Sequence, residues 1–402
     1  MTVSQNAGPA VDTGSPAAND RARFADSANA GETFADDGLT GMVECTGRTS
    51  LTHDVTSFDF FAPWLNRIDF EPGQYVTVRV PELGLERCYS ISSAPFGTNT
   101  FTLTIKRVDG GAVSTHLHDV LKVGDRIHVD GPYGLFSTSF HAGNRHLFVS
   151  GGSGISPIMS MVRSLLARPA GTPTDIVLIH NAATPEDIIF RAELEQLAEV
   201  PGVSVVTMCS RDSSAEVWAG RRGRITRRTL AEVVPEPADR ETFVCGPADY
   251  MSAVRIMLDE LGVLGSRVHE ESFVFATSPA ERLARKGREA EAPATSEPGE
   301  SASGTAGTAA GGSPLSSFGI EFTSSGKHID CDRETTVLDA AVEAGMVFPS
   351  SCEEGMCGTC KSVLVSGEVE MNHAGGIRPK EIAAGKFLPC CSTPLSDLVV
   401  ER

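Results

Sequence analysis

Long apolar runs are absent from this sequence of 402 residues. None of its hydrophobic stretches approaches the roughly 18 consecutive residues that a membrane-spanning helix needs. The N-terminus also lacks the apolar core of a secretory signal, because Ala, Gly, Ser and Asp dominate its first residues. These absences predict a cytoplasmic protein with no membrane-spanning part.

Positive charge is scarce as well. The chain has 34 Lys and Arg residues against 52 Asp and Glu residues, a formal net charge of -18. Nucleic acids and anionic membranes repel a surface of this kind, so we expect neither as a partner. The ten histidines are scattered without ligand spacing, which gives no sign of a histidine metal site.

Aromatic residues are missing from the stretch 277–315, which is rich in Ala, Gly, Ser, Pro and Glu. This composition predicts a flexible linker. Residues 1–38 are similarly polar and predict a disordered N-terminal segment. Without a secretory signal, the ten cysteines indicate metal ligands and free thiols rather than disulfides.

Three folded domains are expected between these segments. Residues 39–143 alternate apolar and polar residues in short runs separated by Gly and Pro, which predicts an antiparallel β-barrel. Residues 144–276 alternate strand-like and helix-like runs, which predicts an α/β doubly wound parallel sheet. Residues 316–402 form a compact α+β domain with strands near 319–322, 327–330, 362–366 and 397–400 and a helix over 337–344.

The final domain carries the strongest motif. Cys352, Cys357 and Cys360 have the spacing C-x4-C-x2-C, and two further cysteines follow at positions 390 and 391. Zinc sites usually use paired C-x2-C knuckles, whereas this spacing with one distant cysteine is typical of a 2Fe–2S cluster. The motif therefore predicts an iron–sulfur cluster whose fourth ligand is Cys390 or Cys391.

The barrel contains a candidate flavin site. Arg87, Tyr89 and Ser90 lie on one extended segment, where a guanidinium suits a pyrophosphate, a phenol ring can lie against a flavin and a hydroxyl can bond the ring edge. The later run Gly110–Thr115 offers free amides and hydroxyls before a helix, which suits phosphate. A structural Arg–Tyr pair and a simple Gly turn would explain either segment alone, but not the two together in this order.

A candidate nicotinamide site follows. The loop Gly151–Pro157 lies between a predicted strand and a predicted helix. Most of its side chains are small, so its backbone amides can approach a diphosphate. It does not have the Gly-x-Gly-x-x-Gly fingerprint. The motif Cys245-Gly246-Pro247 strengthens the interpretation, although Cys245 could instead be a small buried apolar residue.

In these motifs, residues from about 40 to 275 resemble the ferredoxin–NADP reductase family, and the last domain resembles a plant-type ferredoxin with a β-grasp fold. The resemblance implies FAD rather than FMN, although the related branch of phthalate dioxygenase reductase uses FMN with the same modules. It also implies NADH rather than NADPH, although Ser210, Arg211 and the cluster Arg221–Arg224 could hold a 2′-phosphate. The position after an apolar pair favours Cys390 as the fourth cluster ligand.

The resemblance also implies roles for individual residues. The residues expected to bind the flavin are Arg87, Cys88, Tyr89, Ser90, Lys106, Gly111, Val113, Ser114 and Thr115. Nicotinamide binding falls to Gly152, Gly154, Ser156, Gly246 and Pro247, with Glu271 and Phe273 in the segment that closes beside the flavin. Tyr89, Ser90 and Cys245 are the expected catalytic residues, and Cys352, Cys357, Cys360 and Cys390 are the expected cluster ligands.

The order of the modules and the segment Met371–Ile377 resemble the reductase components of Rieske-type oxygenases, in particular the glycine betaine monooxygenase reductase group. A nicotinamide gives up two electrons as a hydride, whereas a 2Fe–2S cluster accepts one at a time, and a flavin can link the two. The expected path is NADH to FAD to 2Fe–2S cluster to a separate acceptor protein, which should carry a basic patch because residues 316–402 hold 13 acidic and seven basic residues. Alternative acceptors are a hybrid-cluster protein, a fatty-acid desaturase and a haem monooxygenase, and a redox sensor is a further alternative.

Overall fold

The computed structural model describes most of the three expected domains, over residues 23–26, 39–169, 172–272, 317–346, 348, 353, 355, 358 and 360–401. The predicted linker 277–315 lies outside the described residues, as does most of the segment 1–38. Within that segment, Arg23–Asp26 form strand β1, which pairs in parallel with β17 (Glu368–Met371). The disorder of the segment 1–38 stays a prediction.

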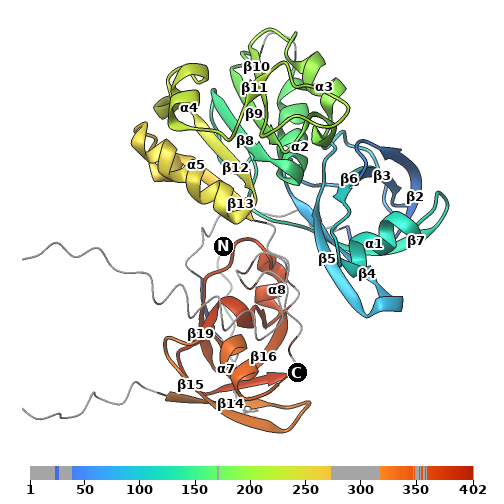
Figure 1. Cartoon of the computed structure of the whole chain (residues 1–402). Coiled ribbons are helices and arrows are strands. Elements are labelled where there is room, and N and C mark those ends of the chain that lie inside the picture. The colour runs from blue at the N-terminus through green and yellow to red at the C-terminus, as the bar shows by residue number, and fades with distance from the viewer. Residues whose placement is uncertain are drawn as a thin grey trace, which may run out of the picture.

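The first domain is an antiparallel barrel, as predicted. Its strands follow the order β5-β4-β7-β2-β3-β6, and a bridge between Ile91 and Leu103 joins the two ends (Figure 1). Helix α1 (Ala112–Asp119) contributes Val113 and Leu117 to the barrel core. The strands are β2 (Gly41–Ser50), β3 (Val55–Phe61), β4 (Tyr75–Val80), β5 (Leu85–Ser90), β6 (Thr100–Lys106) and β7 (Arg126–Tyr133).

The second domain is a doubly wound sheet in which all the strand pairs are parallel, which confirms the predicted class. Its order is β11-β10-β9-β8-β12-β13, and separate apolar cores on the two faces are covered by α2 and α3 on one side and α4 and α5 on the other. The strands are β8 (His146–Gly151), β9 (Ile176–Ala182), β10 (Val203–Cys209), β11 (Arg221–Arg222), β12 (Glu241–Gly246) and β13 (Val268–Ser272). The helices are α2 (Ile155–Leu166), α3 (Arg191–Leu197), α4 (Arg227–Val233) and α5 (Ala248–Glu260).

The third domain is a mixed α+β unit, again as predicted. Its main sheet has the order β15-β14-β20-β16-β18, and helix α7 (Val337–Glu343) packs into the same apolar core. A second small sheet joins β1, β17 and β19. The remaining elements are β14 (Ser317–Phe322), β15 (Lys327–Asp332), β16 (Ser362–Ser366), α8 (Pro379–Ala383), β18 (Lys386–Phe387), β19 (Ser392–Pro394) and β20 (Leu398–Glu401).

One face of α2 attaches the second domain to the barrel. The Ser156 hydroxyl donates to the Thr104 carbonyl at 3.3 Å, and the Ser160 hydroxyl donates to the Ser93 carbonyl at 2.6 Å. One turn further, the Arg163 guanidinium donates to the Ser92 carbonyl at 2.5 Å. Residues spaced by four and three share a helix face, so α2 presents its N-terminal loop to the barrel in a defined position.

No helix in the described ranges combines the length and the apolarity needed to cross a membrane.

Candidate active site

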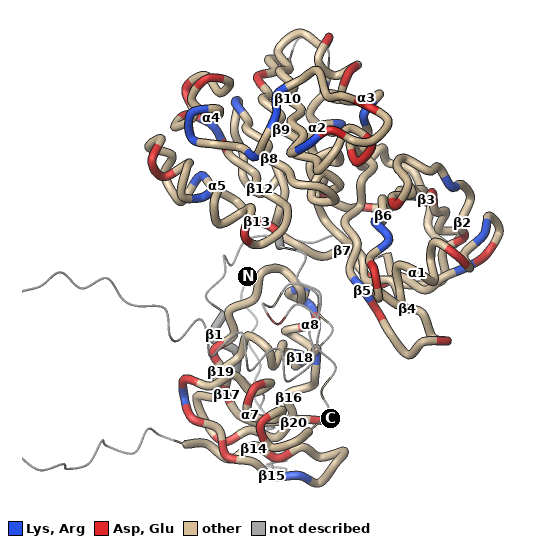
Figure 2. The backbone as a smooth tube through the Cα atoms, in the orientation of Figure 1, with Lys and Arg blue, Asp and Glu red and all other residues tan. Residues whose placement is uncertain are grey.

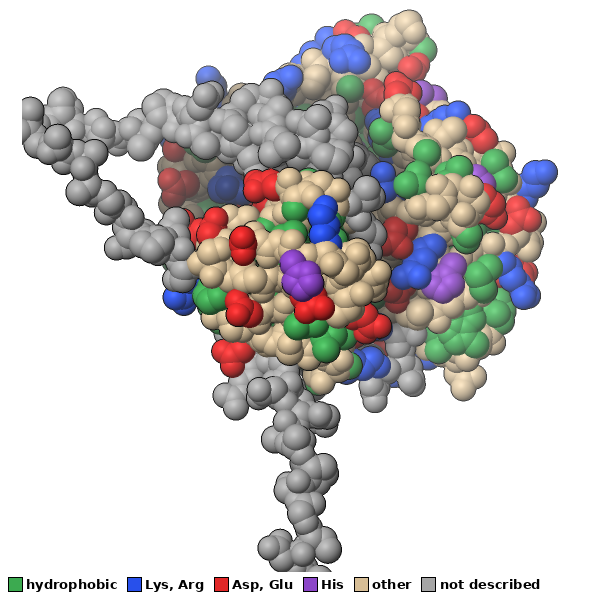
Figure 3. Space-filling view, turned by 90° about the horizontal axis from the view of Figure 1, so that it is seen from below, with side chains coloured by type: hydrophobic (Ala, Val, Ile, Leu, Met, Phe, Trp, Pro, Cys, Tyr) green, Lys and Arg blue, Asp and Glu red, His purple; other side chains and the backbone are tan. Residues whose placement is uncertain are grey.

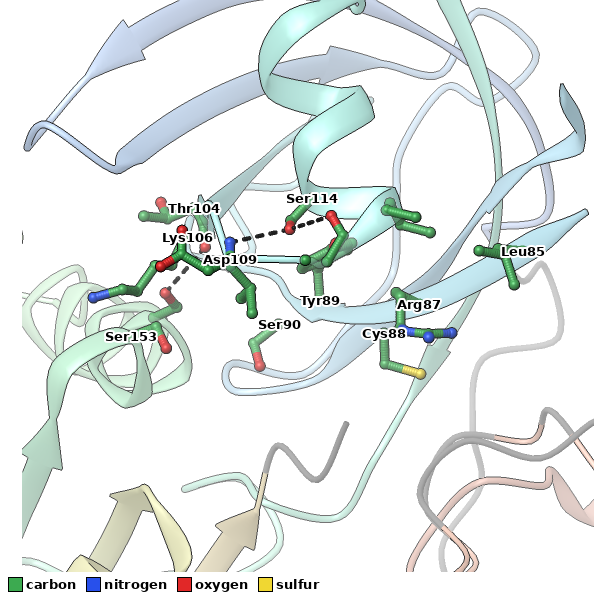
Figure 4. A pocket seen from close by; sticks show the side chains of 16 residues that line it. Leu85, Arg87, Cys88, Tyr89, Ser90, Thr104, Lys106, Asp109, Ser114 and Ser153 are labelled. Atoms are coloured by element: carbon green, nitrogen blue, oxygen red, sulfur yellow. Dashed lines mark hydrogen bonds between the residues drawn. The ribbon is translucent and has the colours of Figure 1, made fainter. Parts of the chain in front are cut away.

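A cavity of about 610 Å³ opens between β5, β6 and the start of α1 (Figure 4). Its volume lies in the range of cofactor sites, which run from roughly 300 to 1,000 Å³. Of the predicted flavin residues, Thr115 alone does not line it. The lining consists of Leu85, Arg87, Cys88, Tyr89, Ser90, Thr104, Lys106, Val108, Asp109, Gly110, Gly111, Ala112, Val113, Ser114, Ser153 and Ser156.

The turn before α1 is shaped as an open cradle. A Cβ atom on Gly111 would lie 2.8 Å from the Ser114 hydroxyl and 3.0 Å from the Val108 carbonyl oxygen, so no side chain fits there. The Ser114 hydroxyl donates to the Gly111 carbonyl and accepts from the Val108 amide, both at 3.1 Å. The start of α1 lines the cavity here, and the first amides of an α-helix have no acceptor within the helix, an arrangement that fits the phosphates of a flavin nucleotide.

The β5 wall supplies the ring-binding groups. Arg87 and Tyr89 are two residues apart on β5, and Ser90 ends the strand. Burial raises the pKa of Tyr89, so its phenol stays protonated. Lys106 also lines the cavity, and its ammonium forms an ion pair with Asp54 at 3.0 Å; its role in flavin binding stays a prediction.

The glycine-rich loop after β8 reaches the same cavity, where Ser153 lies opposite the barrel residues (Figure 4). A Cβ on Gly154 would lie 2.2 Å from the Cys245 carbonyl oxygen, so the loop can pack on β12 only through glycine. Gly151 and Gly246 pack under the ring of Tyr250, whose hydroxyl donates to Asn181 at 2.5 Å. This loop lies where the strand order reverses, the usual place for a dinucleotide in such sheets.

Ser90, Cys245 and Glu271 meet where the two domains join. The Ser90 hydroxyl donates to Glu271 Oε2 at 3.3 Å, and Cys245 is the register partner of Glu271 on the neighbouring strand. Burial raises the pKa of Glu271 to about 8, although the bond from Ser90 acts in the opposite direction. Burial and the nearby Glu271 charge also raise the pKa of Cys245. A pKa raised in this way means that Glu271 keeps its proton at neutral pH, next to Ser90 in the wall of the cavity.

The cluster loop is described in part. Cys360 and Cys390 are both buried in the core of the third domain, whereas Cys352 and Cys357 lie outside the described residues, as does Phe273. Gly355 and Gly358 have φ angles of +70° and +71°, which glycine adopts readily. The Cys391 thiol donates to the Leu388 carbonyl at 3.6 Å. The identity of the fourth ligand remains a prediction.

The cavity residues that were not among the expected binding residues are Leu85, Thr104, Val108, Asp109, Gly110, Ala112 and Ser153. Asp109 could have been found, because Asp-Gly-Gly is a turn signal directly before the predicted phosphate loop. Ser153 lies inside the predicted nicotinamide loop but faces the flavin cavity, and no local pattern reveals that direction.

Replacing Glu271 tests the proton site. A hydride adds negative charge to the flavin, so a charged carboxylate nearby should disfavour the transfer. We expect NADH-dependent flavin reduction in the wild type to fall about tenfold as the pH rises through about 8. The Glu271→Gln variant should show a flat profile in rapid mixing. The control is Glu270→Gln. Glu270 is itself ion-paired with Arg255, whereas Ser90 bonds Glu271, so this variant should keep the wild-type pH profile; a flat wild-type profile contradicts the assignment.

Replacing each late cysteine tests the fourth ligand. Cys390→Ser should abolish the visible absorption of the cluster, because a missing thiolate opens its coordination. Cys391→Ser should retain the absorption. If only Cys391→Ser loses it, Cys391 is the ligand.

Comparison with known proteins agrees with this arrangement. Residues 43–138 match the model of the oxidoreductase FAD-binding domain, residues 148–255 match the oxidoreductase NAD-binding domain, and residues 320–395 match the 2Fe-2S iron-sulfur cluster binding domain. Phthalate dioxygenase reductase has the same fold, with a TM-score of 0.52 at 22% identity over 90% of this chain and 98% of that one.

Two curated relatives align over nearly the whole chain. The glycine betaine monooxygenase reductase subunit of Pseudomonas aeruginosa is 40% identical over 90% of this chain and 94% of its own length. The stachydrine N-demethylase reductase subunit of Rhizobium meliloti is 35% identical over 89% of this chain and 96% of its own. This chain therefore belongs to the family of FAD- and NAD-binding oxidoreductases with a 2Fe–2S domain that includes these two reductase subunits.

Proposed function

We propose that this electron-transfer reductase takes electrons from NADH and delivers them to the terminal component of a Rieske-type monooxygenase that acts on a quaternary amine. The observation that carries the electron path is the junction of Ser90, Cys245 and Glu271, where the flavin cavity meets the nicotinamide loop. A flavin held there would supply the chemistry that links a two-electron hydride donor to a one-electron acceptor.

The residues of this chain orient the donors and handle the proton. The loop Gly151–Gly154 and α2 hold the nicotinamide nucleotide against the barrel. The turn at Gly111 and strand β5 hold the flavin nucleotide on the barrel side of the junction. The Ser90 hydroxyl and Glu271 Oε2 pass a proton in or out as electrons arrive and leave.

The donor is assigned from charges at the carboxyl end of β10. Arg222 is ion-paired with Asp212 at 2.8 Å, and Arg221 is ion-paired with Glu232 at 3.1 Å. A backbone hydrogen bond from Trp218, together with Arg222, lowers the pKa of Asp212, which therefore stays charged. A carboxylate at this edge repels a 2′-phosphate, so this arrangement supports NADH as the donor.

The acceptor is assigned from the relatives and from charge. Both curated relatives are reductase subunits of systems whose names refer to glycine betaine and stachydrine. Acidic residues are prominent along α7, β14 and β15 (Figure 2), and the outer face of the third domain shows more Asp and Glu than Lys and Arg (Figure 3). A basic patch on the acceptor would complement this face and speed encounter.

Reconstitution tests the proposed function. The purified chain should replace the reductase subunit of the P. aeruginosa glycine betaine monooxygenase, giving NADH consumption and formaldehyde release that depend on glycine betaine. Rapid cytochrome c reduction without formaldehyde from any quaternary amine would point to another acceptor, such as a haem monooxygenase, a desaturase or a hybrid-cluster protein. Failure to reduce cytochrome c at all would point to a redox sensor.

Asp212→Asn tests the donor assignment. Removing the carboxylate charge frees Arg222 for a 2′-phosphate, so kcat/KM for NADPH should rise about tenfold while that for NADH changes little. Steady-state reduction of ferricyanide measures both. The matched control Glu232→Gln, which releases Arg221 instead, should leave the ratio unchanged; a wild type that already prefers NADPH would contradict the assignment.

A further inference from the structure

The third domain contacts the barrel through two backbones that approach unusually closely. The Gly134 amide donates to the Gly375 carbonyl at 3.2 Å. A Cβ on Gly375 would lie 3.0 Å from both the Cα and the carbonyl carbon of Gly134. The φ angles of +104° at Gly134 and +90° at Gly375 also favour glycine. This contact therefore needs glycine on both sides.

On the barrel side, the contact lies beside the active site. A Cβ on Gly134 would lie 3.8 Å from Glu271 Oε1 and 2.9 Å from the ring of Tyr75. Gln74 donates to the Gly134 carbonyl at 3.1 Å and holds the turn in place. Since Ser90 bonds Glu271, Gly134 is one residue removed from the flavin cavity.

On the ferredoxin side, the contact lies on the cluster loop. The amides of Ala374 and Gly376, which flank Gly375, donate to the Gly355 carbonyl at 3.1 and 2.9 Å. The Gly376 carbonyl oxygen lies 2.7 Å from the position of a Cβ on Gly358. A continuous series of contacts thus runs from Ser90 to the loop that carries the predicted cluster ligands.

An interdomain clamp of Asp130, Tyr133, Lys361, Arg378 and Glu381 surrounds this contact. The Lys361 ammonium donates to the Tyr133 hydroxyl at 3.3 Å and lies 4.8 Å from the centre of its ring, while the Arg378 guanidinium lies 5.4 Å from that centre. The Tyr133 hydroxyl donates to Asp130 at 2.9 Å, and Glu381 pairs with Lys361 at 2.8 Å and with Arg378 at 3.2 Å.

The charges of the clamp balance, with two cations and two carboxylates. Burial opposes ionisation of Glu381, but the hydrogen bond from Lys361 is among the contacts that lower its pKa to about 2, so it remains charged. A cavity of about 1,020 Å³ lies beside the clamp and is lined by both domains. Separation would therefore expose mainly charged groups that water can solvate, which is typical of a contact that opens and closes.

We propose that the Gly134–Gly375 contact is the junction across which electrons pass from the flavin cavity to the cluster loop, and that the interdomain clamp holds this junction closed but releasable. The inference rests on the proposed electron path. A 2Fe–2S cluster held by the predicted cysteines would accept one electron at a time, so the two electrons of each NADH would cross this junction singly. The accompanying proton leaves through Ser90 and Glu271.

The test uses the full-length holoprotein and anaerobic rapid mixing with NADH. Gly375→Ala should leave flavin bleaching at the wild-type rate and slow cluster bleaching about tenfold or more, because small displacements of reacting groups are costly. The control is Gly345→Ala, which shares a positive φ of +73° but meets no atom within 4 Å and should behave as the wild type.

Tyr133→Leu supplies a second variant that lies in the barrel and leaves the cluster domain unaltered. It should also slow cluster bleaching, and small-angle scattering should show a larger radius of gyration with an unchanged cluster absorption. Wild-type cluster bleaching in both variants, with the cluster retained, overturns the inference alone. Absence of NADH-dependent flavin bleaching in the wild type overturns the proposed function instead. If the Gly375→Ala variant loses its cluster, the rate of cluster bleaching in Tyr133→Leu alone decides: slowed bleaching supports the inference, and a wild-type rate overturns it.

Discussion

The hydrogen bond between Ser90 and Glu271 is the interaction on which the rest of the site depends. It joins the last residue of β5 to the edge strand of the parallel sheet at 3.3 Å, and it places Cys245 and Gly134 around the same buried carboxyl group. The α2 contacts with the barrel hold the two domains in the orientation that this bond requires. The nicotinamide loop, the flavin cavity and the Gly134–Gly375 contact therefore all lie close to Glu271.

There is a physical reason why these three parts of the structure lie close together. Hydride transfer needs the donor and the flavin in contact, whereas onward transfer needs a neighbouring group that accepts single electrons. A buried, protonated carboxyl group can serve both steps, because it adds no charge near the flavin yet can exchange a proton through the Ser90 hydroxyl. The interdomain clamp around Tyr133 then allows the third domain to stay close to the barrel without being packed permanently against it.

Much of this fold could be predicted from local patterns. Strands β15 and β16, expected near residues 327–330 and 362–366, are observed at Lys327–Asp332 and Ser362–Ser366. Strands β11, β17, β18 and β19 were not predicted, because their two to four residues carry little periodicity, and helices α4 and α8 were also not predicted. Helix α5 was also not predicted, although Met251, Val254 and Leu258 have helical spacing.

The candidate site could likewise be predicted only in part from the sequence. The residues of β5 form one local motif and those of the Gly111 turn form another, so each wall of the cavity could be anticipated from its own stretch of sequence. The Asp54 partner of Lys106 and the Gly375 partner of Gly134 are distant in sequence, and tertiary packing alone brings them together. Asp212 and Arg222 are ten positions apart in the sequence, and no local pattern reveals that Asp212 compensates the charge of Arg222 in the arginine cluster.

An anaerobic titration with NADH, followed at the flavin and cluster bands, tests the central claim most directly. If electrons pass from NADH through the flavin to the cluster of the same chain, each chain should take up about three electrons, two on the flavin and one on the cluster. The titration should therefore end near about 1.5 equivalents of NADH with both bands bleached. An end point at about one equivalent with the cluster bands unchanged would contradict the account.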